Sequence, residues 1–298
     1  GELLWTGSVA GVARGLAVSA GRLLVSTDKG ALYCFTGGGE SLGEVAARTD
    51  EPFPKDELTP VFAAAAQRLV KETGITSGYC LVWGCGTGRL AAELARRTNL
   101  RIYGVERDAA KVSAARGALT AAGLYGTRVT IHQDDLSKVA YTDVPYADYF
   151  ANLIVSENAL VSGELPGSPK EVFRMLKPVG GTLYLGQPTN AGLAVAPPAP
   201  NAIRQWLGEA DFQGAKAEVS EGWTKLVRGR LPNTAEWSHQ YANAGNVAAT
   251  ADALVKCPLG VLWFGEPGPD KAVNRHEGAA APLVVGGRCF LQGELLTG

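Results

Sequence analysis

The sequence predicts an α/β protein with a doubly wound sheet, flanked at both ends by antiparallel strands. Apolar strand-like runs alternate with helix-like segments between residues 51 and 230, as expected for a sheet covered by helices on both faces. Residues 1–50 and 231–298 instead contain short strand-like runs separated by glycines. The length of 298 residues fits about two domains, and we expect the domain boundaries at these two changes of pattern.

The middle section begins with a helix predicted at residues 59–74. Pro60 stands in its first turn, apolar residues recur every four positions, and Gly74 ends it. A fully apolar run then predicts a buried strand at residues 79–83. The same alternation predicts further helices at residues 89–97, 108–123 and 201–207, and further strands at residues 101–105, 129–132, 149–155 and 182–186.

Two further signals complete the middle section. Ser168 and Glu171 have the spacing of a capping box, which predicts a helix that ends before Pro178. Residues 216–220 and 222–228 are strand-like and adjacent. We expect them to close the sheet as a hairpin.

The outer sections resemble each other. Strand-like runs at residues 16–18 and 23–26 recur in the same pattern at residues 283–285 and 289–291, and further runs fall at residues 3–5, 31–35 and 261–264. Such self-similarity predicts a repeat architecture.

Composition excludes several classes of function. The net charge of −1 argues against binding to nucleic acid or an anionic membrane. The 3 histidines are far apart and the 5 cysteines contain no Cys-x-x-Cys pair, so we expect no metal site and interpret the cysteines as small buried side chains. The longest uncharged stretch, residues 180–203, contains four prolines and cannot be a continuous membrane helix.

The most informative segment is a glycine-rich loop between the strand at residues 79–83 and the following helix. It reads Gly84-Cys85-Gly86-Thr87-Gly88. Such a loop either brings backbone amides close to a ligand or is only a tight turn. Glu106 ends the next predicted strand, where a carboxylate either accepts the hydroxyls of a ribose or is solvated. The two features fall at the same edge of the sheet, which favours a nucleotide-like ligand.

These residues resemble the class I S-adenosylmethionine-dependent methyltransferases. The resemblance extends to Gly104-Val105-Glu106, to Gln133-Asp134-Asp135-Leu136 and to residues 172–183, and it covers roughly residues 58–228. It implies a Rossmann-like methyltransferase sheet with S-adenosylmethionine as cofactor. It places the methionine part of the cofactor on the glycine loop, the ribose on Glu106 and the adenine amino group near Asp134 or Asp135, and it adds Asn152 as a cofactor contact.

One position departs from the family pattern. The family usually has an acidic residue two positions before the first glycine, where this chain has Val82. A missing carboxylate near the ammonium group of the cofactor is expected to weaken binding. We therefore keep two hypotheses: a methyltransferase that acts on a small molecule or an exposed side chain, and an inactive methyltransferase-like scaffold.

Catalytic residues are not identified by a motif. Methyl transfer needs mainly an in-line arrangement of nucleophile and methyl group, with a base only where the nucleophile must lose a proton. Residues 152–157 occupy the place of substrate-facing residues in the family, and they do not read Asn-Pro-Pro-Tyr, which argues against DNA and glutamine substrates. Ser156 and Glu157 are the candidates, although a solvated loop is the favoured interpretation of both. For His132 and Asp148 we favour a packing or capping role.

The outer sections resemble quinoprotein-like (PQQ-like) β-propeller repeats, on the residues of runs 1–5, 21–25 and 283–290. A propeller needs about four or more blades, so these strands form an incomplete blade. We expect a methyltransferase domain inserted into a propeller, with the strands of both ends paired in one small sheet and with the remaining blades or another chain as partner. A quinone-dependent oxidoreductase is poorly supported. The compartment stays open: cytoplasmic for an active enzyme, extracytoplasmic if the precursor has a signal peptide.

Overall fold

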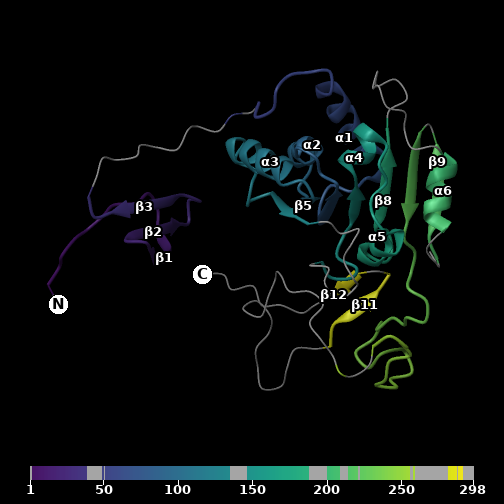
Figure 1. Cartoon of the computed structure of the whole chain (residues 1–298). Coiled ribbons are helices and arrows are strands. Elements are labelled where there is room, and N and C mark those ends of the chain that lie inside the picture. Colours follow the sequence, from purple (N-terminus) through teal and green to yellow (C-terminus); the bar gives the residue numbers. More distant parts are fainter. Residues whose placement is uncertain are drawn as a thin grey trace. The chain divides into compact units, whose positions relative to one another are not determined.

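The computed structural model describes residues 2–38, 49, 51–134, 146–187, 200–208, 214–220, 222–255, 258, 281–286 and 288–290. The chain divides into two compact units, Gly1–Ala47 and Arg48–Gly298. Each unit is described by itself, with the element labels of Figure 1.

The first unit contains an antiparallel meander. Strand β2 (Arg22–Thr27) lies between β1 (Ala13–Ser19) and β3 (Leu32–Thr36). The strand run predicted at residues 3–5 is not part of this sheet. Large apolar side chains of the meander are exposed, among them Leu16 and Val18. In the described part of this unit only Val25 and Thr27 are buried, so the sheet has almost no core of its own.

The second unit contains a seven-stranded mixed sheet in the order β6-β5-β4-β7-β8-β10-β9. Five of its strands are parallel: β4 (Tyr79–Trp83), β5 (Arg101–Glu106), β6 (Val129–Gln133), β7 (Leu153–Val155) and β8 (Thr182–Gly186). The last two are β9 (Lys216–Ser220) and β10 (Trp223–Val227), and β10 runs antiparallel to both β8 and β9. The strand order reverses beside β4, which is where α/β sheets bind ligands.

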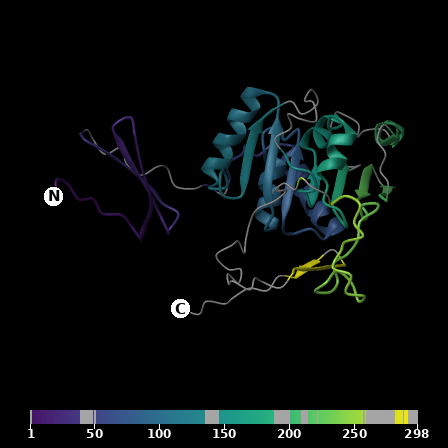
Figure 2. The ribbon, with the colours of Figure 1, turned by 90° about the horizontal axis from the view of Figure 1, so that it is seen from below.

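Helices cover both faces of this sheet (Figures 1 and 2). The helices are α1 (Thr59–Thr73), α2 (Arg89–Arg97), α3 (Ala109–Ala121), α4 (Glu157–Ser162), α5 (Pro169–Met175) and α6 (Pro200–Gly208). The side chains of α1, α2 and α3 pack in one hydrophobic cluster, and those of α5 and α6 pack in another. Helix α4 contributes Leu160 to the first cluster and Ala159 to the second. The doubly wound α/β fold predicted from the sequence is confirmed.

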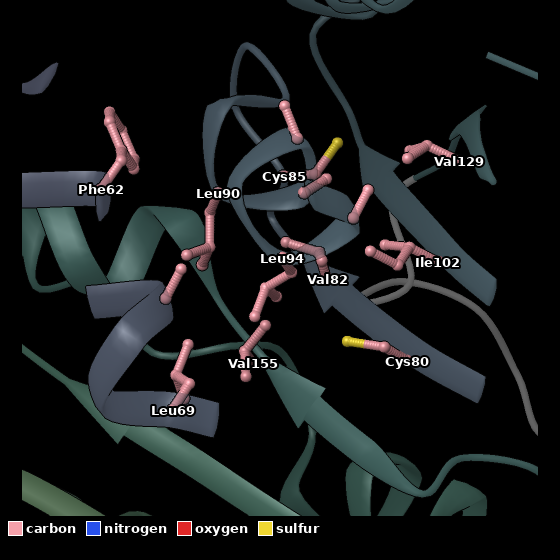
Figure 3. Close-up of a cluster of buried hydrophobic side chains, with 14 of the residues drawn as sticks. Phe62, Leu69, Cys80, Val82, Cys85, Leu90, Leu94, Ile102, Val129 and Val155 are labelled. Atoms are coloured by element: carbon pink, nitrogen blue, oxygen red, sulfur yellow. The ribbon is translucent and has the colours of Figure 1, made fainter. Parts of the chain in front are cut away.

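The two clusters explain why strand β4 is apolar at every position. Along β4, Cys80 and Val82 belong to the first cluster, whereas Leu81 and Trp83 belong to the second. Successive side chains of a strand point to opposite faces, so a strand covered on both sides needs apolar residues throughout. Figure 3 shows the first cluster, with Leu69 of α1 and Leu90 and Leu94 of α2 beside the strand residues.

Three predicted local features differ from the structure. The strand expected at residues 149–155 is shortened to Leu153–Val155, and Tyr149 has a φ of 63° that an extended strand cannot contain. The Ser168 side chain makes no capping hydrogen bond, although α5 begins directly after it. Cys34 and Cys289 are exposed, whereas Cys80 and Cys85 are buried as predicted.

The C-terminal section of the second unit contains a short hairpin. Strand β11 (Leu283–Val285) pairs with β12 (Arg288–Phe290), and Trp237 forms a further bridge to Val284. The β1–β3 meander and the β11–β12 hairpin are each described as a sheet of their own unit. The single sheet shared by the two ends, expected from the propeller hypothesis, stays a prediction. No helix in the described part of the chain is long and apolar enough to cross a membrane.

Candidate functional site

The glycine loop connects β4 to α2 with a backbone that only glycine adopts readily. Gly84, Gly86 and Gly88 have φ angles of 61°, 52° and 82°, which lie in the left-handed region. Space restricts the same positions. A Cβ on Gly86 would lie 2.5 Å from Glu157 Oε1, and a Cβ on Gly84 would lie 2.7 Å from Asn158 Nδ2. The backbone of the loop therefore lies so close to Glu157 and Asn158 that a side chain at Gly86 or Gly84 would collide with them.

Glu106 connects the end of β5 to this loop. Its side chain is buried, and its Oε2 accepts a hydrogen bond from the Gly86 amide at 2.9 Å. Its Oε1 accepts one from the Asp108 amide at 3.1 Å. Each carboxylate oxygen accepts two hydrogen bonds, so both oxygens retain capacity for the hydroxyls of a ligand. The backbone of Asp134 is held beside it, because the Asp134 amide donates to the Glu106 carbonyl at 3.1 Å.

A hollow of about 110 Å³ lies at this edge of the sheet. Its lining includes Gly84, Glu106, Asp134 and Ser156, which come from the ends of four different strands. It is completed by the side chains or backbone of Trp83, Val105, Arg107, Asn158, Glu164, Leu165, Pro166 and Gly167. The predicted ribose residue and one predicted adenine residue thus share one cavity with the first loop glycine. Asp135 lies outside the described residues.

A second hollow of about 510 Å³ lies beside the other part of the loop. Gly86, Thr87 and Glu157 contribute to its wall, and Asn158 borders both hollows. The remaining lining is mainly apolar and comes from residues before α1, from α1, α3 and α4: Pro52, Phe53, Pro54, Leu58, Phe62, Ala114, Ala118 and Val161, with Asp56, Arg89 and Lys111 as charged members. The two hollows therefore differ in character: the smaller has a mixed, more polar lining and the larger is mainly apolar.

Arg89 holds the segment that forms one wall of the larger hollow. Its guanidinium donates to Asp56 Oδ2 at 2.8 Å, to the Pro54 carbonyl at 2.6 Å and to Thr59 Oγ1 at 3.2 Å. It also lies over the rings of Phe53 and Phe62. The hydrogen bond and charge of Arg89 lower the pKa of Asp56. Residues before α1 are thereby fixed over the N-terminus of α2.

Glu157 and Ser156 are not in a solvated loop, which corrects the interpretation favoured from the sequence. Both side chains are buried, because the chain turns directly from β7 into α4. Ser156 Oγ accepts from the Ala159 amide at 3.0 Å and caps α4. Glu157 accepts hydrogen bonds from the amides of Thr87 at 3.0 Å and Leu90 at 2.9 Å. Burial raises the pKa of Glu157 to about 7, although these amides and Arg89 oppose the rise.

Two other residues of the predicted loop do not line either hollow. The Cys85 side chain is buried in the core, in contact with the position that a Gly104 Cβ would occupy, and Figure 3 shows it there. Burial raises the pKa of its thiol well above the usual value. Gly88 packs against Ala115 of α3. Both residues shape the loop rather than the surface of a cavity.

Asn152 lies at the opposite edge of the sheet. Its Oδ1 accepts from the Tyr79 amide at the start of β4 at 3.0 Å, and it precedes β7 rather than following it. The structure does not bring Asn152 to the glycine loop, because the predicted strand is shorter at its beginning. His132 and Asp148 make the packing contacts expected of them, His132 with Tyr146 Oη at 2.6 Å and Asp148 with Arg174.

Several lining residues were not found from the sequence. Arg107 and Asn158 directly follow predicted site residues and could have been found from that position alone. Phe53 and Asp56 precede the first helix in a segment without periodicity, and their role depends on Arg89. No sequence signal identifies such a contact between distant segments.

Comparisons with known proteins agree with this geometry. Residues 81–180 match a family model described as a methyltransferase domain. The sterol 24-C-methyltransferase of Eremothecium gossypii is 25% identical over 253 residues, which cover 75% of this chain and 66% of that protein. The chain thus spans less than two thirds of that relative's length.

Two of the solved structures that the chain matches are methyltransferases by their descriptions. One is described as an S-adenosyl-L-methionine-dependent methyltransferase from Methanococcus maripaludis, with 20% identity, a TM-score of 0.48, and coverage of 59% of this chain and 88% of that chain. Another is geranyl diphosphate C-methyltransferase from Streptomyces coelicolor A3(2), solved with S-adenosyl-L-homocysteine, with 14% identity, a TM-score of 0.41, and coverage of 55% and 74%.

Residues 81–180 are thus similar to a methyltransferase domain, and this similarity supports S-adenosylmethionine as the cofactor. The site residues fit this molecule. A loop whose Cβ positions are sterically blocked admits close approach of a ligand, and the buried carboxylate of Glu106 offers two acceptors to a ribose diol. Asp134 borders the same cavity and can accept from an amino group.

Proposed function

We propose that this protein transfers a methyl group from S-adenosylmethionine to a small molecule with an apolar body. The observation that carries the proposal is the pairing of two hollows across one glycine loop. The polar hollow contains Glu106 and Asp134, and the apolar hollow adjoins it at Asn158. A group transfer between two molecules needs two adjacent sites of this kind, and their different linings suit a nucleoside and an apolar acceptor.

The residues of the chain would act mainly by positioning. When bound, the cofactor supplies an electrophilic methyl group on a sulfonium. Glu106 would hold the ribose, Asp134 the adenine, and the backbone of Gly84 and Gly86 the methionine part. Fixing two reactants in an attack geometry can lower a barrier by roughly 7–11 kcal/mol, so the site needs no nucleophile of its own. Ser156 caps α4 with its hydroxyl and is assigned no reaction step.

Two observations support an apolar acceptor. The walls of the larger hollow are formed by prolines, phenylalanines and alanines, which offer few partners to a polar molecule. The curated relative is named for action on a sterol. An acceptor side chain on another macromolecule is the alternative, and the rim of this hollow would then have to be open to a larger partner.

The inactive scaffold kept as an alternative has less support. It depended on Val82 as the apolar residue before the loop. The comparisons instead match methyltransferases, and a buried carboxylate, Glu157, borders the loop from another strand.

Isothermal titration of the full chain with S-adenosylhomocysteine tests the first half of the proposal. We expect micromolar binding, and absence of binding at millimolar ligand would remove the enzyme function. Incubation with cofactor carrying a labelled methyl group then tests the acceptor. Label should appear in organic-extractable small molecules from a cell extract, and it should be lost with the Glu106→Ala variant. Label found only in protein would contradict a small-molecule acceptor.

We further propose that the flanking strands pair with a larger β-structure such as a propeller. Its support is the exposure of Leu16, Val18 and Leu32 on the β1–β3 meander, since apolar strands normally pack against a second layer. The first unit expressed alone would then aggregate. The Leu16→Lys and Val18→Lys variants would keep it soluble, and a soluble unmodified unit would contradict this proposal.

A further inference from the structure

Glu157 is a buried carboxylate without a cationic partner in the described part of the chain. Its side chain is 3% exposed. It accepts from the amides of Thr87 and Leu90, with a longer contact of 3.5 Å to Thr87 Oγ1. Arg89, whose charge lowers the pKa of Glu157, donates its hydrogen bonds to Asp56 and Pro54 instead. Buried charges in proteins are normally paired, so this carboxylate is suited to a cation that the chain itself does not provide.

Glu157 contacts the same loop that an acidic residue precedes in the family, at the position where this chain has Val82. Val82 is fully buried within the first hydrophobic cluster, so no acid precedes the loop on β4. Glu157 reaches the same loop from the end of β7, with Oε1 2.5 Å from the Cβ position of Gly86. Glu106 accepts the Gly86 amide from the other side. Gly86 therefore lies between two buried carboxylates, one at each hollow.

We propose that Glu157 binds the ammonium group at the amino-acid end of the cofactor and so replaces the acid missing at position 82. This assignment rests on the proposed function. The attraction between a carboxylate and an ammonium group strengthens where water is excluded. The adenosine end of the same molecule would lie at Glu106, on the other side of Gly86. Glu157 thus becomes a cofactor-binding residue rather than the base of the reaction.

The competing explanation is structural. Glu157 accepts hydrogen bonds from the amides of Thr87 and Leu90 at the start of α2, and a carboxylate at a helix N-terminus stabilises the helix. A purely structural role would change folding stability and would affect all ligands alike. A role in ammonium binding would affect only ligands that carry this group.

Two ligands separate these roles. S-adenosylhomocysteine carries the ammonium group, whereas 5′-methylthioadenosine has the same nucleoside without the amino-acid end. We would titrate both into the full chain, its Glu157→Gln variant and, as a matched control, its Glu106→Gln variant. Glu157→Gln should lower the affinity for S-adenosylhomocysteine about 10-fold or more, as expected for a hydrogen bond to a charged group. It should leave the affinity for 5′-methylthioadenosine nearly unchanged. Glu106→Gln should weaken both.

Equal effects of Glu157→Gln on both ligands, or no effect on either, would overturn the assignment. If the variant does not fold, the wild-type protein provides a second test. S-adenosylhomocysteine should bind more weakly as the pH falls below about 7, where Glu157 becomes protonated, and 5′-methylthioadenosine should not. The other charged groups of this region are Arg89, Asp56, Lys111 and Glu106. A wild-type protein that binds neither ligand would refute the proposed function itself, which is a different result.

Discussion

The two sides of the glycine loop are built from similar groups but were not equally visible in the sequence. On one side Glu106 ends β5 and faces a polar hollow, and on the other Glu157 follows β7 and faces an apolar one. Glu106 ends the strand that follows the glycine loop and its helix, and this order of elements can be predicted from the sequence. Glu157 stands in a segment that resembled a solvated loop. Carboxylates that follow two different strands thus reach one loop, because both strands end at the same edge of the sheet.

The largest effect on ligand binding is expected from blocking the loop between these two sides. In a Gly86→Val variant the new side chain meets the Glu157 carboxylate, since even a Cβ would lie 2.5 Å from it. The φ of 52° adds backbone strain. We expect S-adenosylhomocysteine affinity, measured by titration, to fall by about 100-fold or more, which is about 2.7 kcal/mol.

A matched control for this variant is Gly117→Ala. Gly117 is exposed in α3 and has open space at its Cβ position. Alanine there should raise stability by up to about 1 kcal/mol and leave binding unchanged. Retained binding in Gly86→Val would mean that the ligand does not approach this loop.

Stability should depend on pH through Glu157. Its pKa in the folded protein is raised from 4.5 to about 7, so folding favours the protonated form. The stability of the ligand-free protein is then highest below pH 4.5 with respect to this group, and it falls as the pH rises through 7, by up to about 3 kcal/mol. Urea unfolding of wild type and Glu157→Gln between pH 4.5 and pH 8 measures the difference between them. A difference that grows in favour of wild type with rising pH would contradict the raised pKa.

A substitution at Glu106 should change the affinity for any ligand that contains the nucleoside. The Glu106→Gln variant retains the shape of the side chain but loses its charge, and it should weaken 5′-methylthioadenosine by about 10- to 100-fold, the cost of one strong hydrogen bond to a charged group. Competition binding with adenosine alone would check this. A variant that binds adenosine as well as wild type would show that the ribose lies elsewhere.

The smallest effect concerns the wall of the apolar hollow. An Arg89→Met variant loses the bonds to Pro54 and Thr59, and we expect a loss of about 1–2 kcal/mol in the free energy of unfolding. Binding of 5′-methylthioadenosine should stay unchanged, while methyl transfer to the acceptor should fall. Impaired nucleoside binding would contradict the separation of the two hollows.

Much of the sheet could be predicted because its strands are buried on both faces. Residues 79–83, 89–97 and 182–186 were bounded correctly from the sequence. Local patterns determine such elements, since every residue of β4 needs an apolar side chain. The strand at Leu153–Val155 was predicted too long, because the turn at Tyr149 depends on contacts with distant residues.

Site residues could be predicted only where the backbone geometry requires a particular residue type at a particular place in the sequence. This holds for residues at strand ends, namely Gly84, Gly86 and Glu106. The burial of Glu157 depends on the start of α4 and on its contacts with α2, which no neighbouring residue indicates. Asn152 was misplaced for a related reason, since one end of a short strand cannot be distinguished from the other without its partners.

A crystal structure of the full chain with S-adenosylhomocysteine would test the central claim most directly. We predict the ribose hydroxyls within hydrogen-bond distance of Glu106 and the ammonium group within hydrogen-bond distance of Glu157, with the ligand passing over Gly86. A ligand bound away from this loop, or one whose ammonium group contacts neither Glu157 nor its neighbours, would contradict it.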